Sequence, residues 1–308
     1  MPRITAPDQE EIMRLGGEPE SSHFEDRTGQ GGGFGFGGGG GSALGCLIPL
    51  VMSRFGLGGV LILIVGYFVL SSLGAFSGGG GGIVPGSGTQ RGTPGQSTLT
   101  PDMQQFLVRT LGSTEQTWNE ILAKSGATYR PASMVAYSGG TQTACGFGQT
   151  AAGPFYCPSD QTIYIDPAFF NELSQRFGAP GDAAAAYVIA HEVGHHIQNL
   201  QGTLDRAQQA QARASRTEGN AVQVQVELQA DCYAGVWASS ARDEQGSILE
   251  AGDAQEALRA AEAVGDDTLQ KQTQGHVVPD SFTHGTSEQR MAAFNRGLSS
   301  GNPAACRI

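Results

Sequence analysis

Residues 55–76 carry no charged side chain over 22 consecutive positions. A helix rises about 1.5 Å per residue, so this run is long enough to cross the ~30 Å hydrocarbon core of a bilayer. A buried helix of a soluble domain of that length usually keeps a polar face, which this run lacks. We therefore expect a membrane segment over 43–76. In it, an apolar approach stretch, stopped by Pro49 and Arg54, leads into a single transmembrane helix.

Glycine is distributed unevenly, and more than half of the 47 glycines lie before residue 99. Such stretches have much backbone freedom and few side chains that could form a core. We therefore expect residues 1–42 to be a disordered tail and residues 77–98 to be a flexible Gly/Pro/Ser linker. The folded domain is then expected over 99–308.

The net charge of -11, with 29 acidic and 18 basic residues, argues against nucleic acid as a partner. Binding to phosphates needs a cluster of lysine and arginine side chains, and residues 99–308 contain no such cluster. The partners expected from the sequence are therefore the lipid bilayer and, from the motifs below, a peptide or protein substrate.

Charge and cysteine content predict where the domain lies. Arg54 abuts the N-terminal side of the apolar run, so the positive-inside tendency places residues 1–42 in the cytoplasm and the domain in the periplasm or outside the cell. Cys46 lies at the membrane edge, and the four later cysteines suit two disulfides in an oxidising compartment. The alternative is a zinc site made of all four thiolates, but the spacing of these cysteines does not resemble the paired C-x-x-C motifs of such sites. We expect Cys145 to pair with Cys157 and Cys232 with Cys306.

The pattern of the domain predicts an α+β fold in which helices dominate. Short strands are expected at 132–137 and 161–167. Helical spacing covers 99–112, 114–126, 182–200, 206–219, 220–242 and 253–267. The strand at 162–167 is the expected edge against which an extended peptide could pair.

His191, Glu192 and His195 form an H-E-x-x-H motif within the helix expected at 182–200. The two histidines are four residues apart and share one helix face, so both can reach one Zn²⁺. Glu192 is the next residue round the helix from His191, where its carboxylate can reach a water on the metal and act as a general base. His196 points elsewhere and is expected to pack or to support a ligand.

A catalytic zinc needs a third protein ligand and an open fourth position. His23 is expected across the membrane, and His276 and His284 lie in loop-like sequence. Glu227 is the better candidate because it lies in an otherwise nearly uncharged helix. Asp231, four residues later on the same face, is expected to orient a ligand histidine.

HEVGHH followed by ELQADCYAGVW resembles the gluzincin pattern. The closer similarity is to the bacterial putative neutral zinc metallopeptidases, and it also rests on GPFYCPSDQTIYIDPAFF and HGTSEQR. The resemblance implies a zincin-like domain, one zinc per chain and the ligands His191, His195 and Glu227. It implies a chemistry more firmly than a substrate.

The expected reaction is peptide hydrolysis at a cell membrane, with Glu192 as the base. His284 or Arg290 is expected to stabilise the oxyanion, while an N-cap at Thr286 or Ser287 with Arg290 in a structural ion pair is equally compatible. The alternative function is a non-catalytic, membrane-anchored zinc scaffold or chaperone-like module. Glu192 disfavours it, since a purely structural zinc site needs no base.

Overall fold

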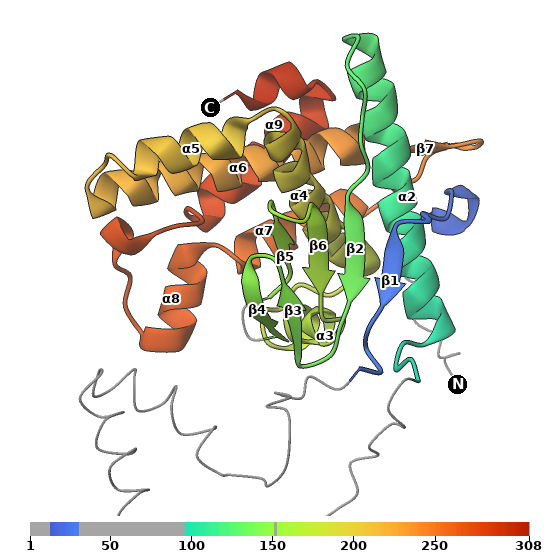
Figure 1. The fold of residues 1–308 in the computed structure, drawn as a ribbon, viewed down its shortest axis with the longest axis horizontal. Coiled ribbons are helices and arrows are strands. Elements are labelled where there is room, and N and C mark those ends of the chain that lie inside the picture. Colours follow the sequence, from blue (N-terminus) through green and yellow to red (C-terminus); the bar gives the residue numbers. More distant parts are fainter. Residues whose placement is uncertain (1–12, 31–95, 151–152, 308) are drawn as a thin grey trace, which may run out of the picture. The chain divides into compact units, whose positions relative to one another are not determined.

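A four-stranded sheet covered by helices forms the frame of the protein (Figure 1). The structure is a computed structural model that describes residues 13–30, 96–150 and 153–307. The sheet has the order β1-β2-β6-β5, with β1 (Phe24–Asp26), β2 (Ser133–Ala136), β6 (Thr162–Ile165) and β5 (Phe155–Cys157). β1, β2 and β6 are parallel, and β5 is antiparallel to β6.

Helices make up most of the described chain, as the α+β prediction requires. They are α2 (Pro101–Lys124), α3 (Ala168–Gln175), α4 (Asp182–Leu200), α5 (Thr203–Gln211), α6 (Arg216–Ser240), α7 (Asp253–Ala263), α8 (Asp266–Gln274) and α9 (Ser287–Ser300). Short 3-10 turns are η1 (Leu15–Gly17), η3 (Pro279–Ser281) and η4 (Pro303–Cys306). Two hairpins complete the fold, β3 (Gly140–Thr143) with β4 (Gly146–Gln149), and β7 (Arg242–Asp243) with β8 (Gly246–Ser247).

The two helical stretches expected at 99–112 and 114–126 form the single helix α2. Gly112 does not end it, because this glycine lets another segment approach: a Cβ there would lie 2.0 Å from the carbonyl oxygen of Pro19. The helix begins after Thr100, whose side chain accepts a hydrogen bond from the amide of Met103. It ends before Gly126, which has φ +75°.

α4 lies at the centre of the hydrophobic core. Ile189, Val193 and Ile197 belong to a buried cluster that also includes side chains of α2, β2 and β6. Tyr187 and Ala190 belong to a second cluster, shared with α6, α7 and α9. A helix packed on several sides in this way is held rigidly, which suits it to carry a site.

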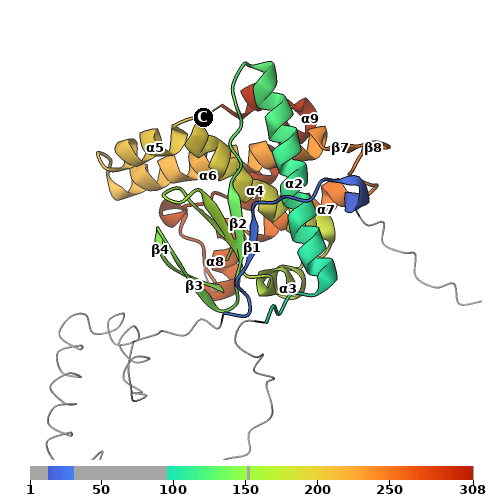
Figure 2. The same ribbon diagram turned by 45° about the vertical axis from the view of Figure 1, so that its right-hand side comes forward.

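Residues 13–30 fold with the domain, so the prediction of a disordered tail is wrong for them. β1 extends the sheet, with Phe24 opposite Met134 and Asp26 opposite Ala136 (Figure 2). Met13 is buried, and its amide donates to Asp182 at the start of α4. Composition did not predict that this segment is folded, because its structure depends on pairing with residues far along the chain.

The chain departs from the domain and returns to it at one place. The amide of Thr98 donates to the hydroxyl of Thr28 at 2.9 Å. Both flanks of residues 31–95 therefore belong to one folded unit. Residues 13–30 thus fold together with the domain from which the expected topology separates them by a membrane.

The expected membrane segment over 43–76 lies outside the described residues, as do Cys46 and residues 77–95 of the linker expected over 77–98. Among the residues that the structure describes, no helix is both long and apolar enough to cross a bilayer.

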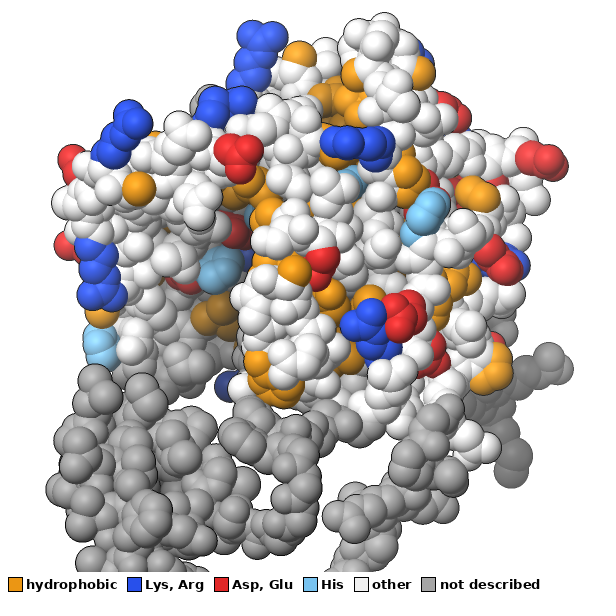
Figure 3. All heavy atoms as spheres, viewed as in Figure 1, with side chains coloured by type: hydrophobic (Ala, Val, Ile, Leu, Met, Phe, Trp, Pro, Cys, Tyr) orange, Lys and Arg blue, Asp and Glu red, His pale blue; other side chains and the backbone are white. Residues whose placement is uncertain are grey.

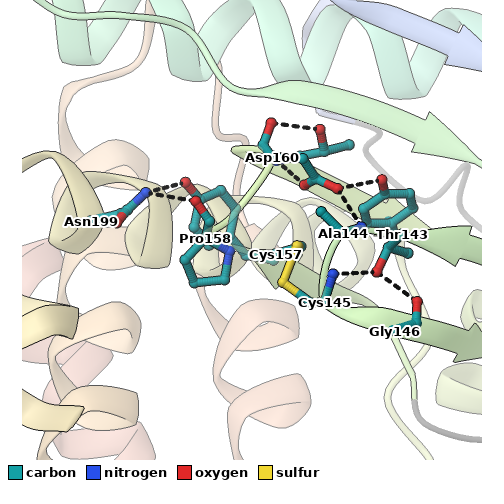
Figure 4. The surroundings of a disulfide bond; sticks show 11 residues. Thr143, Ala144, Cys145, Gly146, Cys157, Pro158, Asp160 and Asn199 are labelled. Carbon is teal, nitrogen blue, oxygen red and sulfur yellow. Dashed lines mark hydrogen bonds between the residues drawn. A yellow bond between two sulfur atoms is a disulfide. The ribbon is translucent and has the colours of Figure 1, made fainter.

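Both predicted disulfides are confirmed: Cys145 pairs with Cys157, and Cys232 with Cys306. The first links the turn between β3 and β4 to β5, and Asp160 accepts a hydrogen bond from the amide of Ala144 beside it (Figure 4). The second links α6 to η4 near the end of the chain.

The sheet order corrects the expected substrate edge. β6 lies between β2 and β5, so both of its edges are already paired. β5 is the outer strand on that side of the sheet, and its Phe155 and Tyr156 line the cleft described below.

Candidate metal centre

The close approach of α4 and α6 brings the ligand-type side chains together. Gly194, inside the H-E-x-x-H motif, faces Ala230 of α6, and a Cβ at this glycine would lie 2.9 Å from the Ala230 carbonyl oxygen. Any larger residue would push the helices apart. Glycine therefore allows Glu227, one turn before Ala230, to reach the histidines.

His191, His195 and Glu227 offer ligand atoms that all lie within 4.8 Å of one another. The Nε2 atoms of His191 and His195 lie 3.2 Å and 3.5 Å from the same Glu227 oxygen, Oε2. Two imidazoles and one carboxylate form a typical ligand set for a catalytic zinc. The expected ligands therefore converge from two helices, and they fit this ion.

Asp231 holds His191 from behind. Its Oδ1 lies 2.8 Å from His191 Nδ1 and accepts hydrogen bonds from the Tyr187 hydroxyl at 2.5 Å and from Arg290 at 2.8 Å. Arg290 Nε also donates to Asp231 Oδ2 at 2.9 Å. A carboxylate at Nδ1 keeps the proton there, which leaves Nε2 free for a metal.

The charges of the buried side chains favour a divalent cation. Glu192, Glu227, Asp231 and Arg290 are all buried. With both imidazoles neutral, three carboxylates and one guanidinium leave two negative charges uncompensated. Burying such an imbalance is costly. A cation of charge +2 between His191, His195 and Glu227 would remove it.

With the protein atoms alone, protons on His191 and His195 would balance the buried negative charge. Burial lowers the pKa of His191, but Asp231 and Glu227 outweigh burial and raise that pKa to about 10. Burial also lowers the pKa of His195, and Glu227 more than reverses the effect. Conversely, burial raises the pKa of Glu227, but His195 and His191 hold it well below its usual value. Zinc would displace these protons from the imidazoles.

The sequence of residues 13–308 matches the model of the family described as "Putative neutral zinc metallopeptidase". The chain belongs to this family. The uncharacterized protein YpfJ of Escherichia coli K12 is 45% identical over 298 residues, which cover 96% of this chain and 98% of the relative. The uncharacterized protein Rv2575 of Mycobacterium tuberculosis H37Rv is 43% identical over 213 residues, 66% of this chain and 70% of the relative. No solved structure matches the chain significantly.

In this member of the zinc metallopeptidase family, the ligand group lies at a cleft of about 1040 Å³. Figure 3 shows histidine side chains beside acidic and basic ones in a recess of the surface. Glu192 lines the cleft next to the two histidines, and burial raises the pKa of its carboxyl group. Other parts of the cleft are lined by aromatic and aliphatic side chains, among them Phe155, Phe169 and Leu204, and by polar ones such as Arg176 and Gln208.

Both candidate oxyanion donors, His284 and Arg290, line the cleft, but they differ in exposure and in their partners. His284 lines the cleft, and its side chain is 48% exposed. Its amide donates to Asp266, whose carboxylate also lies 3.2 Å from the ring Nδ1. Arg290 is buried and committed to Asp231, and Thr286 is the N-cap of α9. The alternative of a capped helix with Arg290 in an ion pair thus describes this segment.

The other histidines of the prediction lie elsewhere. His196 is fully buried, with Nδ1 at 2.9 Å from the Tyr156 hydroxyl and Nε2 at 2.6 Å from the Arg130 carbonyl oxygen. It is therefore a packing residue. His23, expected across the membrane, belongs to the same folded unit and contacts Glu115 at 3.0 Å.

Sequence reasoning missed three polar residues around the ligands. Tyr187 donates to Asp231, Gln223 donates to Glu227 Oε1 at 2.8 Å, and Gln198 contacts His195. The helical spacing of four from Tyr187 to His191 and from Gln223 to Glu227 was the available signal.

Proposed function

We propose that this protein is a zinc-dependent peptidase that hydrolyses peptide bonds in the cleft beside α4. The observation that carries the proposal is the convergence of His191, His195 and Glu227 at the cleft, with Glu192 next to them but outside the ligand set. Bound there, zinc would supply a Lewis acid that acidifies water and polarises the scissile carbonyl.

Glu192 is the general base in this proposal. It takes a proton from the attacking water and delivers it to the nitrogen of the leaving amine. A carboxyl with a raised pKa suits both steps, because it binds the proton long enough to transfer it. His284 donates to the developing oxyanion from the cleft wall, while Arg290 and Asp231 keep His191 in place.

The substrate is proposed to lie extended along β5. Phe155 and Tyr156 of this outer strand line the cleft, and its partner β6 occupies only one of its edges. An extended peptide would add a strand there and present its backbone to the centre.

A non-catalytic scaffold or chaperone-like module is the alternative, and the donor set disfavours it. Structural zinc sites are closed by four protein ligands. Here, within the described part of the chain, three donors converge, and they open onto a cleft.

Digestion of a peptide library by the zinc-loaded protein tests the proposal. We expect cleavage that a chelator abolishes and added zinc restores. A library that the zinc-loaded protein leaves intact would support the scaffold instead.

We also propose that the domain lies outside the cytoplasm and contacts the bilayer through the apolar residues 43–76. Two disulfides support an oxidising compartment. Residues 13–30 must share that side because β1 is part of the sheet.

The variants Glu20→Cys and Glu288→Cys, each made in a Cys46→Ser background, test this topology. Both positions are exposed. A membrane-impermeant maleimide should label both positions on intact spheroplasts, and the four disulfide cysteines should stay unlabelled. Label at Glu288 alone before lysis would contradict the pairing of β1 with β2. Label at neither position would contradict the location outside the cytoplasm.

A further inference from the structure

The second ligand histidine is held by a neutral amide rather than a carboxylate. His195 Nδ1 lies 2.9 Å from Gln198 Oε1, one helical turn further along α4. We propose that Gln198 is a positioning residue that fixes the tautomer of His195, and that Gln229 and the carbonyl of Cys306 hold Gln198 in its orientation. This inference rests on the proposed zinc site.

The orientation of the Gln198 amide follows from its neighbours. Its Nε2 donates to the backbone carbonyl of Val226 at 2.7 Å and to Gln229 Oε1 at 3.0 Å. A backbone carbonyl oxygen only accepts hydrogen bonds. Rotating the amide by 180° would place an oxygen against it, so Oε1 must face His195.

The Gln229 amide is fixed in the same way. Its Nε2 donates to the backbone carbonyl of Cys306 at 2.7 Å, so its Oε1 faces Gln198. Each of the two side-chain amides therefore donates to a backbone carbonyl oxygen, which can only accept a hydrogen bond.

The consequence for His195 is a defined proton position. Because Gln198 Oε1 can only accept, the proton of the neutral ring lies on Nδ1, which leaves the lone pair of Nε2 for a metal. That Nε2 is the atom that faces Glu227. Gln198 is fully buried and Gln229 and Cys306 nearly so, so these hydrogen bonds lie away from bulk water.

The choice of an amide fits the charge of the site. Asp231 already serves His191, and Glu192 and Glu227 complete the two uncompensated charges that a divalent cation balances. A second orienting carboxylate would leave one negative charge unbalanced after zinc binding. A neutral acceptor orients His195 without that cost.

The disulfide extends this support to the end of the chain. Cys306 is bonded to Cys232 on α6, which keeps its carbonyl beside Gln229. The C-terminal turn η4 is thus part of the support of a metal ligand, although it contributes no ligand itself.

The test is the rate at which zinc passes from the purified protein to a colorimetric chelator. Substitutions of residues that orient zinc ligands typically cost about 10–100-fold in affinity. We expect Gln198→Met to release zinc about 10–100-fold faster than wild type. Gln229→Met should give a smaller increase, and Gln225→Met, the same change at an exposed position of α6, should have no effect.

Cobalt substitution adds a readout that a general loss of packing would not move. The visible absorption bands of bound Co²⁺ should shift in Gln198→Met and stay unchanged in Gln225→Met. Zinc release from Gln198→Met within twofold of wild type, with unchanged cobalt bands, would overturn the inference.

If Gln198→Met does not fold, Gln229→Met decides, and release at the wild-type rate would then overturn it. Zinc release does not depend on turnover, so these results stand apart from whether peptides are cleaved. Failure of the peptidase proposal appears instead as an intact peptide library with stoichiometric zinc bound.

Discussion

The Glu192→Gln variant is expected to keep its zinc and to lose peptide cleavage. Glutamine has nearly the same shape as glutamate but cannot accept the proton of the attacking water. General-base catalysis contributes about 10²–10⁴-fold, so we expect kcat/KM to fall by about 10³. The measurement is cleavage of a quenched peptide taken from the library, with zinc content determined on the same samples.

Two observations make this variant a clean probe of chemistry. Glu192 is outside the group of side chains that offers ligand atoms, so its loss leaves the donors in place. Glu192 also takes no part in the hydrogen bond between Arg290 and Asp231, so both partners of that ion pair remain in the variant. Glu120→Gln, the same change at an exposed position of α2, is the matched control and should cleave like wild type. Wild-type cleavage by Glu192→Gln would remove the general base from the mechanism.

The second large effect is expected on metal binding. Glu227→Ala removes the only anionic donor of the group and leaves two histidines on one helix. Its loss should cost more than the ~10–100-fold that changes around the ligands cost. We expect zinc content after dialysis to fall from one per chain to nearly none, and cleavage to fall with it.

Glu288→Ala, at an exposed position of α9, should retain one zinc per chain and serves as the control. Gln223→Ala is informative beside it. Among the described hydrogen bonds to the three candidate ligands, Gln223 makes only the one to Glu227 Oε1. The variant should therefore bind zinc more weakly than wild type but retain it. Retention of stoichiometric zinc by Glu227→Ala would place the third ligand elsewhere.

The grouping of His191, His195 and Glu227 was predictable because its signals are local. His191 and His195 share a helix face by their spacing, and Glu227 and Asp231 stand out as acids in an apolar helix. The disulfides were predictable from four cysteines in a domain where two lie close in sequence. Each of these patterns depends on periodicity or separation along the chain alone.

Other features depend on contacts that a linear pattern does not carry. β1 has three residues, and it is a strand only because β2 lies beside it. The position of β6 inside the sheet, which leaves β5 as the outer strand, depends on strand order. The sequence around Gln198 shows only a polar residue in a helix. Its role depends on Val226 and Gln229 of another helix, which fix the orientation of its amide.

X-ray data collected on both sides of the zinc absorption edge, from crystals of the zinc-loaded protein, test the central claim most directly. We expect one anomalous difference peak, about 2.0–2.1 Å from Nε2 of His191 and of His195 and within bonding distance of Glu227. A peak instead among the carboxylates of Asp182, Asp253 and Glu256, the other group of described residues with ligand atoms close together, would contradict the account. So would a map without any peak at His191, His195 and Glu227.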